Sequence, residues 1–144
     1  MAADPTPSVR GERRQVAALP WRRGAEGPEI LLITSRETRR WVIPKGGRMT
    51  GRSDAEAAAQ EALEEAGVEG LVDERPLGQF RYLKQQKRRA PRWLTVDVYG
   101  LRVEAEHDDW KERAERVREW MSREEAARRV DEPELKALIA AFEP

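Results

Sequence analysis

The chain has 144 residues, no cysteine, and 27 basic residues against 27 acidic ones, so its formal net charge is zero. This length suits one domain with a single core, and the charge balance argues against nucleic-acid or membrane binding driven by net charge. The absence of cysteine excludes disulfides, thiolate metal sites and cysteine nucleophiles. Because no apolar stretch reaches the roughly 20 residues that span a bilayer and no signal-peptide pattern opens the chain, we expect a cytoplasmic location and no membrane partner.

The N-terminal third of the sequence predicts a tail followed by a hairpin. Residues 1–12 include two prolines and few apolar side chains, so we expect a flexible tail there and a folded domain over 13–144. Residues 15–21 and 29–35 have the apolar character of strands and are separated by a turn that contains glycine and proline. A shorter apolar strand at 41–43 runs into a glycine-rich loop, where the backbone can approach a ligand closely.

The best-defined element is a helix over residues 54–66. Ser53 and Glu56 form the Ser-x-x-Glu pattern of a capping box, which predicts where the helix begins. Gly67 is the residue type that most often follows the last turn of a helix. Both ends of this helix are therefore predicted from local signals alone.

Three glutamates share one side of this helix. At about 100° per residue, Glu61, Glu64 and Glu65 fall within an arc of roughly 100°, opposite a face of alanine and leucine. None of them has a lysine or arginine three or four residues away, although like charges at that spacing cost about 0.2–0.5 kcal/mol per pair. A solvated acidic face is the alternative interpretation. We expect a counter-ion from outside the helix, and carboxylate oxygens suit Mg²⁺ or Mn²⁺.

The C-terminal half predicts a second hairpin and two helices. Residues 78–83 and 93–103 have strand patterns, and the segment between them contains no acid but several basic residues, as expected of a hairpin tip. Helices are expected at 122–130 and 134–142. Strands and helices follow one another without regular alternation, which indicates a mixed α/β fold with a mixed sheet between helices.

Several common catalytic arrangements are absent from the sequence. His107 is the single histidine and no Gly-x-Ser-x-Gly elbow is present, so a Ser-His-Asp triad is not indicated. The sequence also contains neither a Gly-x-x-x-x-Gly-Lys-Ser/Thr loop nor a Gly-x-Gly-x-x-Gly motif. We assign most of the five tryptophans to core packing and none of them to base stacking.

Residues 46–68 resemble the Nudix box, whose pattern is Gly, five residues, Glu, seven residues, Arg-Glu, an aliphatic residue, any residue, Glu-Glu, any residue, Gly and an aliphatic residue. Gly46 begins the match, Glu61 and the pair Glu64 and Glu65 occupy its glutamate positions, and Gly67 lies at its end. The resemblance implies an α/β/α sandwich with a mixed sheet and metal-assisted hydrolysis of a phosphoanhydride. It further implies Mg²⁺ or Mn²⁺ as cofactor, held by Glu61, Glu64, Glu65 and the Gly46 region, with Glu64 deprotonating the attacking water.

Two charged positions depart from the box. Arg52 stands where the family has glutamate, and Gln60 stands where it has arginine. In the family that arginine helps to orient a catalytic glutamate. Because the two departures change charge in opposite senses, we hypothesise that Arg52 supplies the cation that Gln60 lacks. A catalytically weak domain that senses a nucleotide or an inositol phosphate is the alternative that these departures motivate.

Short matches at 41–47, 64–68, 108–110 and 118–120 resemble the diphosphoinositol polyphosphate phosphohydrolase branch of the family. That branch cleaves diphosphoinositol polyphosphates and dinucleoside polyphosphates, which implies a polyphosphorylated small molecule as substrate. An RNA 5′-end pyrophosphohydrolase that guides its strand along the basic hairpin is a further alternative. No sequence feature indicates an oligomeric state. The expected phosphate contacts are basic residues near the box, on the predicted hairpin tip and in the 118–120 match: Arg36, Arg40, Lys45, Arg88, Arg89 and Arg118.

Overall fold

The computed structural model describes residues 13–144, so the predicted tail at 1–12 lies outside the described residues. Seven strands and three α-helices make up the described part, with one 3₁₀ turn before the last strand. In chain order they are β1 (Arg13–Gly24), β2 (Gly27–Thr34), β3 (Trp41–Val42), β4 (Lys45–Gly47), α1 (Asp54–Ala66), β5 (Val68–Gln86), β6 (Arg89–Glu106), η1 (Arg113–Glu115), β7 (Arg118–Ser122), α2 (Arg123–Arg129) and α3 (Pro133–Ala140).

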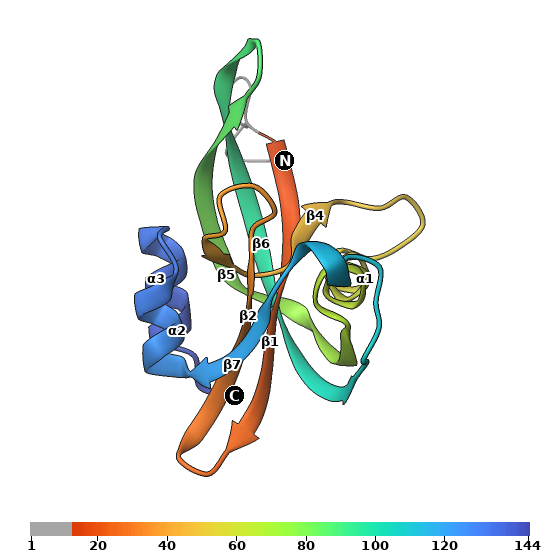
Figure 1. The fold of residues 1–144 in the computed structure, drawn as a ribbon, viewed down its shortest axis with the longest axis vertical. Coiled ribbons are helices and arrows are strands. Elements are labelled where there is room, and N and C mark those ends of the chain that lie inside the picture. Colours follow the sequence, from red (N-terminus) through yellow and green to blue (C-terminus); the bar gives the residue numbers. More distant parts are fainter. Residues whose placement is uncertain (1–12) are drawn as a thin grey trace, which may run out of the picture.

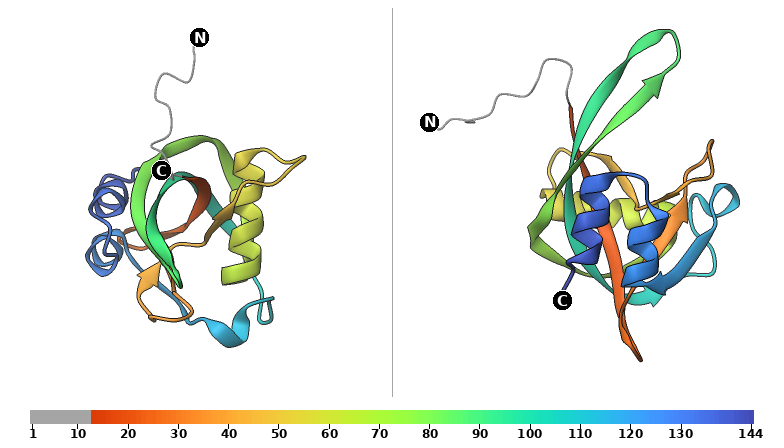
Figure 2. Two further views of the ribbon diagram at one scale, coloured as in Figure 1. Left: turned by 90° about the horizontal axis from the view of Figure 1, so that it is seen from above. Right: turned by 90° about the vertical axis from the view of Figure 1, so that its left-hand side faces the viewer.

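The strands form one mixed sheet, as predicted. Its order is β3-β2-β1-β6-β5, while β4 pairs with β1 and β7 pairs with β2. Strands β1 and β6 are parallel, and the other pairs are antiparallel. Helix α1 packs on one side of the sheet and α2 and α3 pack on the other (Figure 1; Figure 2, left). The predicted sandwich of helices around a mixed sheet is confirmed.

Alternation along the central strands builds a core on each side of the sheet. In β1, Ala17 and Leu19 join the core under α2 and α3, whereas Val16 and Ala18 join the core under α1. Successive strand side chains point to opposite faces, which explains this division. The buried face of α1 is mostly alanine, so this helix lies close to the sheet and to β4. The acidic side of α1 is thereby held beside the glycine loop.

The second hairpin is longer than the sequence predicted. Strands β5 and β6 continue pairing out to Gln86 and Arg89, and only Lys87 and Arg88 form the turn, with Arg88 at φ 61°. The outer part of this hairpin projects beyond the body of the domain (Figures 1 and 2), where most of its side chains face solvent. Because neither face of the outer hairpin is fully covered, its residues do not alternate between apolar and polar. The sequence pattern therefore could not predict that these strands continue to pair.

Other boundaries shift for identifiable reasons. The predicted strand at 41–43 is confined to β3, and after the buried Ile43 and Pro44 the predicted glycine loop begins with a further short strand, β4, which pairs with a different neighbour. Residues 118–121, directly before the predicted helix at 122–130, belong to β7, which pairs with β2. Within the described range, no helix combines the length and the apolar character needed to cross a bilayer. Three tryptophans pack against the two cores as expected, namely Trp21, Trp41 and Trp120.

Candidate metal and phosphate site

Helix α1 begins and ends where the sequence predicts. The Ser53 hydroxyl accepts a hydrogen bond from the Glu56 backbone N–H at 3.0 Å, and the Glu56 carboxylate accepts one from the Ser53 N–H at 2.8 Å. At the other end, Gly67 has φ 70° and donates to the carbonyls of Ala62 and Leu63. These caps fix the angular position of the glutamate stripe relative to the sheet.

Glu61 lies directly against the backbone of Gly46. A Cβ atom placed on Gly46 would lie only 2.3 to 2.7 Å from the carboxyl atoms of Glu61. The Glu61 side chain also interacts with that of Glu65, one turn further along the helix, and the interaction contributes to the pKa shifts of both carboxylates. Only glycine at position 46 leaves room for this carboxylate beside the β4 backbone, which is the arrangement expected if both supply oxygen ligands to one cation.

Glu65 is buried, with 8% of its surface exposed. Burial raises the pKa of Glu65 to about 8, against the lowering effect of Arg116, and the neighbouring Glu61 carboxylate adds to the rise. Burial also raises the pKa of Glu61. The Glu65 carboxylate lies 3.4 Å from the Lys45 backbone N–H and 3.5 Å from the Arg116 guanidinium. A buried carboxylate that retains a proton beside a second, half-buried carboxylate forms a site where a divalent cation can replace that proton.

Glu64 points to different partners. One carboxylate oxygen accepts from the Gln60 amide at 2.8 Å, and the other lies 3.5 Å from the Lys111 ammonium. In the described part of the chain, no three acidic or histidine side chains converge as a complete ligand shell. The oxygen donors nevertheless fit a hard divalent cation in chemistry and in their arrangement along one stripe. The assignment of Gly46, Glu61, Glu64 and Glu65 to metal binding therefore stays a prediction.

Part of the counter-charge for the stripe comes from the loop before β7. Lys111 faces Glu64, and Arg116 lies between Glu65 and Glu112, with its guanidinium 2.8 Å from the Glu112 carboxylate. The sequence predicts neutralisation by a metal alone and does not single out Lys111 or Arg116. Their signal was the tryptophan of the 108–110 match: the Trp110 indole N–H donates to the Glu65 carbonyl at 3.1 Å and docks the loop on α1.

A basic cavity of about 770 Å³ opens beside Glu65. Of the predicted phosphate contacts, Arg36, Lys45 and Arg89 line it, and Arg36 is also paired with Glu115 at 3.3 Å. The Lys45 ammonium lies 4.9 Å from the centre of the Tyr82 ring, and burial lowers the pKa of Lys45. Arg116, which the sequence did not single out, lines the same cavity. These side chains place cationic groups next to the carboxylates of α1.

Three of the predicted phosphate contacts lie elsewhere. Arg40 pairs with Asp131 at 3.3 Å and with Glu132 at 3.1 Å, and Arg88 occupies the hairpin turn. Arg118 donates to the carbonyls of Ala66, Gly67 and His107 and stacks on Trp110. Its guanidinium therefore stabilises the C-terminal end of α1. Their contacts favour structural or peripheral roles over phosphate binding in the cavity.

The raised pKa of Glu65 predicts how pH affects the metal-free protein. Between the ordinary value of 4.5 and about 8, the folded protein holds a proton that the unfolded chain has lost. The contribution of this proton to the free energy of unfolding is complete below pH 4.5 and is lost as the pH rises through about 8. The metal-free protein should therefore become less stable across that interval. Urea unfolding in EDTA at pH 5.5 and 8.5 measures this loss. Glu65→Gln should remove most of the pH dependence; a variant that retains all of it would contradict the assignment.

Comparison with known proteins shows which family has this sequence and fold. The family model described as the NUDIX domain matches residues 11–142. Nudix hydrolase 12, mitochondrial, from Arabidopsis thaliana is 36% identical over 101 residues, which cover 68% of this chain and 50% of that protein. Diphosphoinositol polyphosphate phosphohydrolase 3-beta from Bos taurus is 34% identical over 118 residues, which cover 81% of this chain and 68% of that protein.

Solved structures support the fold. A crystal structure of C. elegans Ap4A hydrolase matches with a TM-score of 0.60 at 22% identity, over 88% of this chain and 92% of that one. The chain spans only about half to two thirds of the length of the curated relatives it matches. Several of those relatives carry "mitochondrial" in their names, so the cytoplasmic location stays a prediction. The matched domain, the sandwich and the box on α1 agree, and the chain belongs to the Nudix family.

Proposed function

We propose that this protein is a metal-dependent hydrolase that cleaves phosphoanhydride bonds in polyphosphorylated small molecules. The proposed class comprises dinucleoside polyphosphates and diphosphoinositol polyphosphates. The observation that supports it most directly is the cavity beside Glu65, which has six basic residues and two acidic ones in its lining. Such a lining attracts a dense polyanion and brings it against the carboxylates of α1.

The chemistry we propose is attack by water on phosphorus. The water oxygen bonds to phosphorus, the P–O bond of the anhydride breaks, and the leaving phosphate keeps the electron pair. Glu64 accepts the proton of the water and, together with Glu61, Glu65 and the Gly46 backbone, would hold the cation. When bound, Mg²⁺ or Mn²⁺ neutralises charge that develops on the diphosphate oxygens and makes water more acidic. Lys45 and Arg116 would contact phosphate oxygens from the cavity wall.

A neighbouring cavity of about 570 Å³ favours one member of the proposed class. It shares Tyr82 and Lys84 with the basic cavity and is also lined by Leu83 and Trp93. Leu83 and Trp93 face each other across β5 and β6, and they are 41% and 45% exposed. An exposed aromatic surface beside a phosphate-binding cavity suits a substrate with a base or other flat group. Within the class, this favours dinucleoside polyphosphates.

A substrate panel tests the proposal. It contains dinucleoside polyphosphates, diphosphoinositol polyphosphates, nucleotide sugars and 5′-triphosphorylated RNA, each with Mg²⁺ and with Mn²⁺, and product release is measured. We expect turnover of dinucleoside polyphosphates, which Trp93→Ala should weaken through KM by about 10-fold if one base stacks there. The same substitution should leave the KM for a diphosphoinositol polyphosphate unchanged.

Other outcomes of the panel decide between the alternatives. Tight binding of a nucleotide or inositol phosphate without any product would favour a sensor. Turnover restricted to RNA, with an affinity that falls steeply with salt, would favour an RNA 5′-end pyrophosphohydrolase. The absence of both binding and turnover across the whole panel would reject the proposed function.

A further inference from the structure

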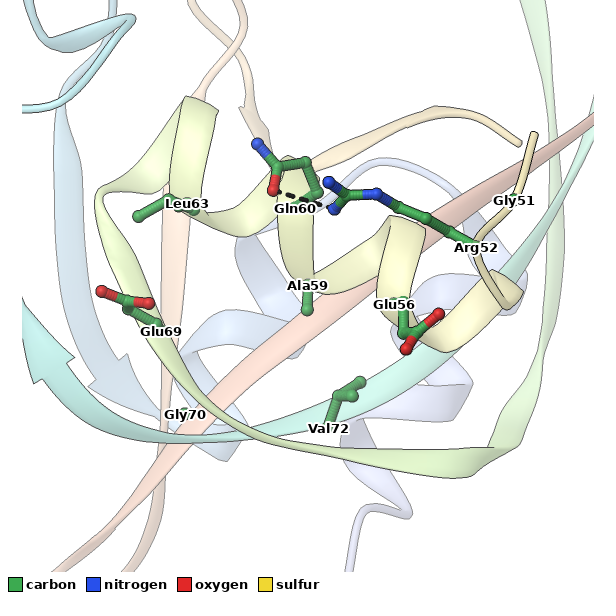
Figure 3. Close-up of a pocket in the computed structure, with 9 residues that line it drawn as sticks. All are labelled: Gly51, Arg52, Glu56, Ala59, Gln60, Leu63, Glu69, Gly70 and Val72. Carbon is green, nitrogen blue, oxygen red and sulfur yellow. Dashed lines mark hydrogen bonds between the residues drawn. The ribbon is translucent and has the colours of Figure 1, made fainter. Parts of the chain in front are cut away.

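The glutamate proposed as the base is held by a neutral side chain rather than by a helix-borne cation. The Gln60 amide nitrogen donates to Glu64 at 2.8 Å. The amide oxygen of the same Gln60 accepts from the Arg52 guanidinium at 3.2 Å, the contact drawn in Figure 3. Arg52, Gln60 and Glu64 thus form a continuous chain of two hydrogen bonds along α1.

The fold of the segment before α1 puts Arg52 within reach. Gly51 has φ 80°, a conformation that suits glycine, and the Arg52 N–H donates to the Met49 carbonyl at 3.2 Å. The chain then enters the capped end of the helix at Ser53. From that position the Arg52 side chain extends beside the first turns of α1 to the Gln60 amide (Figure 3). Gln60 and Glu64 are one turn apart, so their side chains lie on the same face.

The arrangement constrains which end of the Gln60 amide faces Glu64. A glutamine side chain offers an oxygen that accepts and an NH₂ group that donates, while guanidinium only donates and an ionised carboxylate only accepts. With Arg52 on one side and Glu64 on the other, one amide orientation satisfies both partners, and the reversed orientation satisfies neither. Arg52 therefore makes Gln60 a donor toward Glu64, and the two bonds polarise each other.

We propose that Arg52 and Gln60 are positioning residues that act through this chain to fix the Glu64 carboxylate. The inference rests on the proposed function, since Glu64 is the base in that mechanism. It also gives the two departures from the box a common explanation: a cation displaced to position 52 acts through an amide at position 60. Because Arg52 is exposed, the chain should contribute little to stability and mainly to the orientation of Glu64.

A double-mutant cycle tests whether Arg52 acts only through Gln60. Gln60→Met should lower kcat and weaken Mn²⁺ binding by about 10-fold each, the usual effect of removing a partner of a metal-site residue. Arg52→Met should change both in the same direction and by less. In the double variant, Arg52→Met should add nothing to Gln60→Met. Mn²⁺ binding is measured by calorimetry without substrate, and thermal unfolding checks that stability is unchanged.

Two matched variants complete the cycle. Arg48→Met removes another exposed cation before the helix, one paired with Asp54 at 3.0 Å, and should leave kcat and Mn²⁺ binding as in the wild type. The double variant Arg52→Glu with Gln60→Arg places an acidic, a basic and an acidic side chain at positions 52, 60 and 64, as in the family pattern. It should recover most of the activity that Arg52→Glu alone loses. A double variant no better than Arg52→Glu would contradict the proposal.

The Gln60 amide gives a readout that depends neither on metal nor on turnover. Its side-chain ¹H–¹⁵N signals are identified by their disappearance in Gln60→Met, and Arg52→Met should shift them toward the values of a free amide. If the substrate panel yields no product but this shift is observed, the proposed function is rejected while the hydrogen-bonded series Arg52–Gln60–Glu64 is supported. The proposal is rejected if Arg52→Met leaves the Gln60 signals unmoved. It is also rejected if Arg52→Met lowers kcat and Mn²⁺ affinity as much in the Gln60→Met background as in the wild type.

Discussion

Glu64→Gln should lower kcat by roughly 10²- to 10⁴-fold, the range expected when a general base is removed. The substitution replaces a proton acceptor with an amide of the same shape. Its oxygen can still accept from Gln60, while the contact with the exposed Lys111 loses its charge. The free energy of unfolding should therefore change by less than about 1 kcal/mol. Steady-state kinetics and urea unfolding of the same preparation measure both quantities.

A comparison with Glu61→Gln separates a base from a metal ligand. If Glu61 serves only as a ligand, saturating Mg²⁺ or Mn²⁺ should recover much of its activity, whereas no metal concentration should rescue Glu64→Gln. Glu119→Gln makes the same chemical change on an exposed part of β7 and should behave like the wild type. If saturating metal restores the rate of Glu64→Gln, Glu64 serves only as a ligand and another group accepts the proton.

Helix α1 could be predicted from sequence because every signal for it is local. The capping box, the terminal glycine and the angular spacing of three glutamates depend on residues within one short segment, and the structure reproduces all of them. The order of strands and helices predicted a mixed sheet between helices, and the family resemblance implied the same sandwich. The neighbouring loop could not be predicted this way, because Lys111, Arg116 and the docked Trp110 meet α1 through tertiary contacts with residues far away in the sequence.

The same limit explains the mixed outcome for the basic residues. Sequence proximity to the box made Arg40 and Lys45 equally good candidates for phosphate contact. In the structure, Lys45 lines the cavity, while Arg40 is paired with Asp131 and Glu132 from the segment between α2 and α3. A charge cluster in the sequence cannot distinguish a free cation from one whose partner lies some 90 residues away, since that partner is set by tertiary packing.

Gly46→Ala is expected to weaken metal binding with little change in the stability of the fold, and without removing any carboxylate. Gly46 has a backbone conformation that alanine can adopt, because its φ is not positive. The added Cβ would meet the Glu61 carboxyl group at 2.3 to 2.7 Å, and a flexible side-chain end yields more easily than the backbone. Glu61 should swing away, so that Mn²⁺ affinity and activity each fall by about 10-fold or more, the effect expected when a metal ligand is displaced.

Gly47→Ala is the matched control for this prediction. A Cβ on Gly47 meets nothing within 4 Å, so the same chemical change one residue later should leave metal binding intact. Both substitutions reduce the freedom of the unfolded chain similarly, which should offset the strain at position 46 and keep both variants within about 1 kcal/mol of wild-type stability. Calorimetric Mn²⁺ titration and urea unfolding of the two variants give the comparison. Because only the contact with Glu61 differs, equal Mn²⁺ affinities would show that this carboxylate does not bind the ion beside β4.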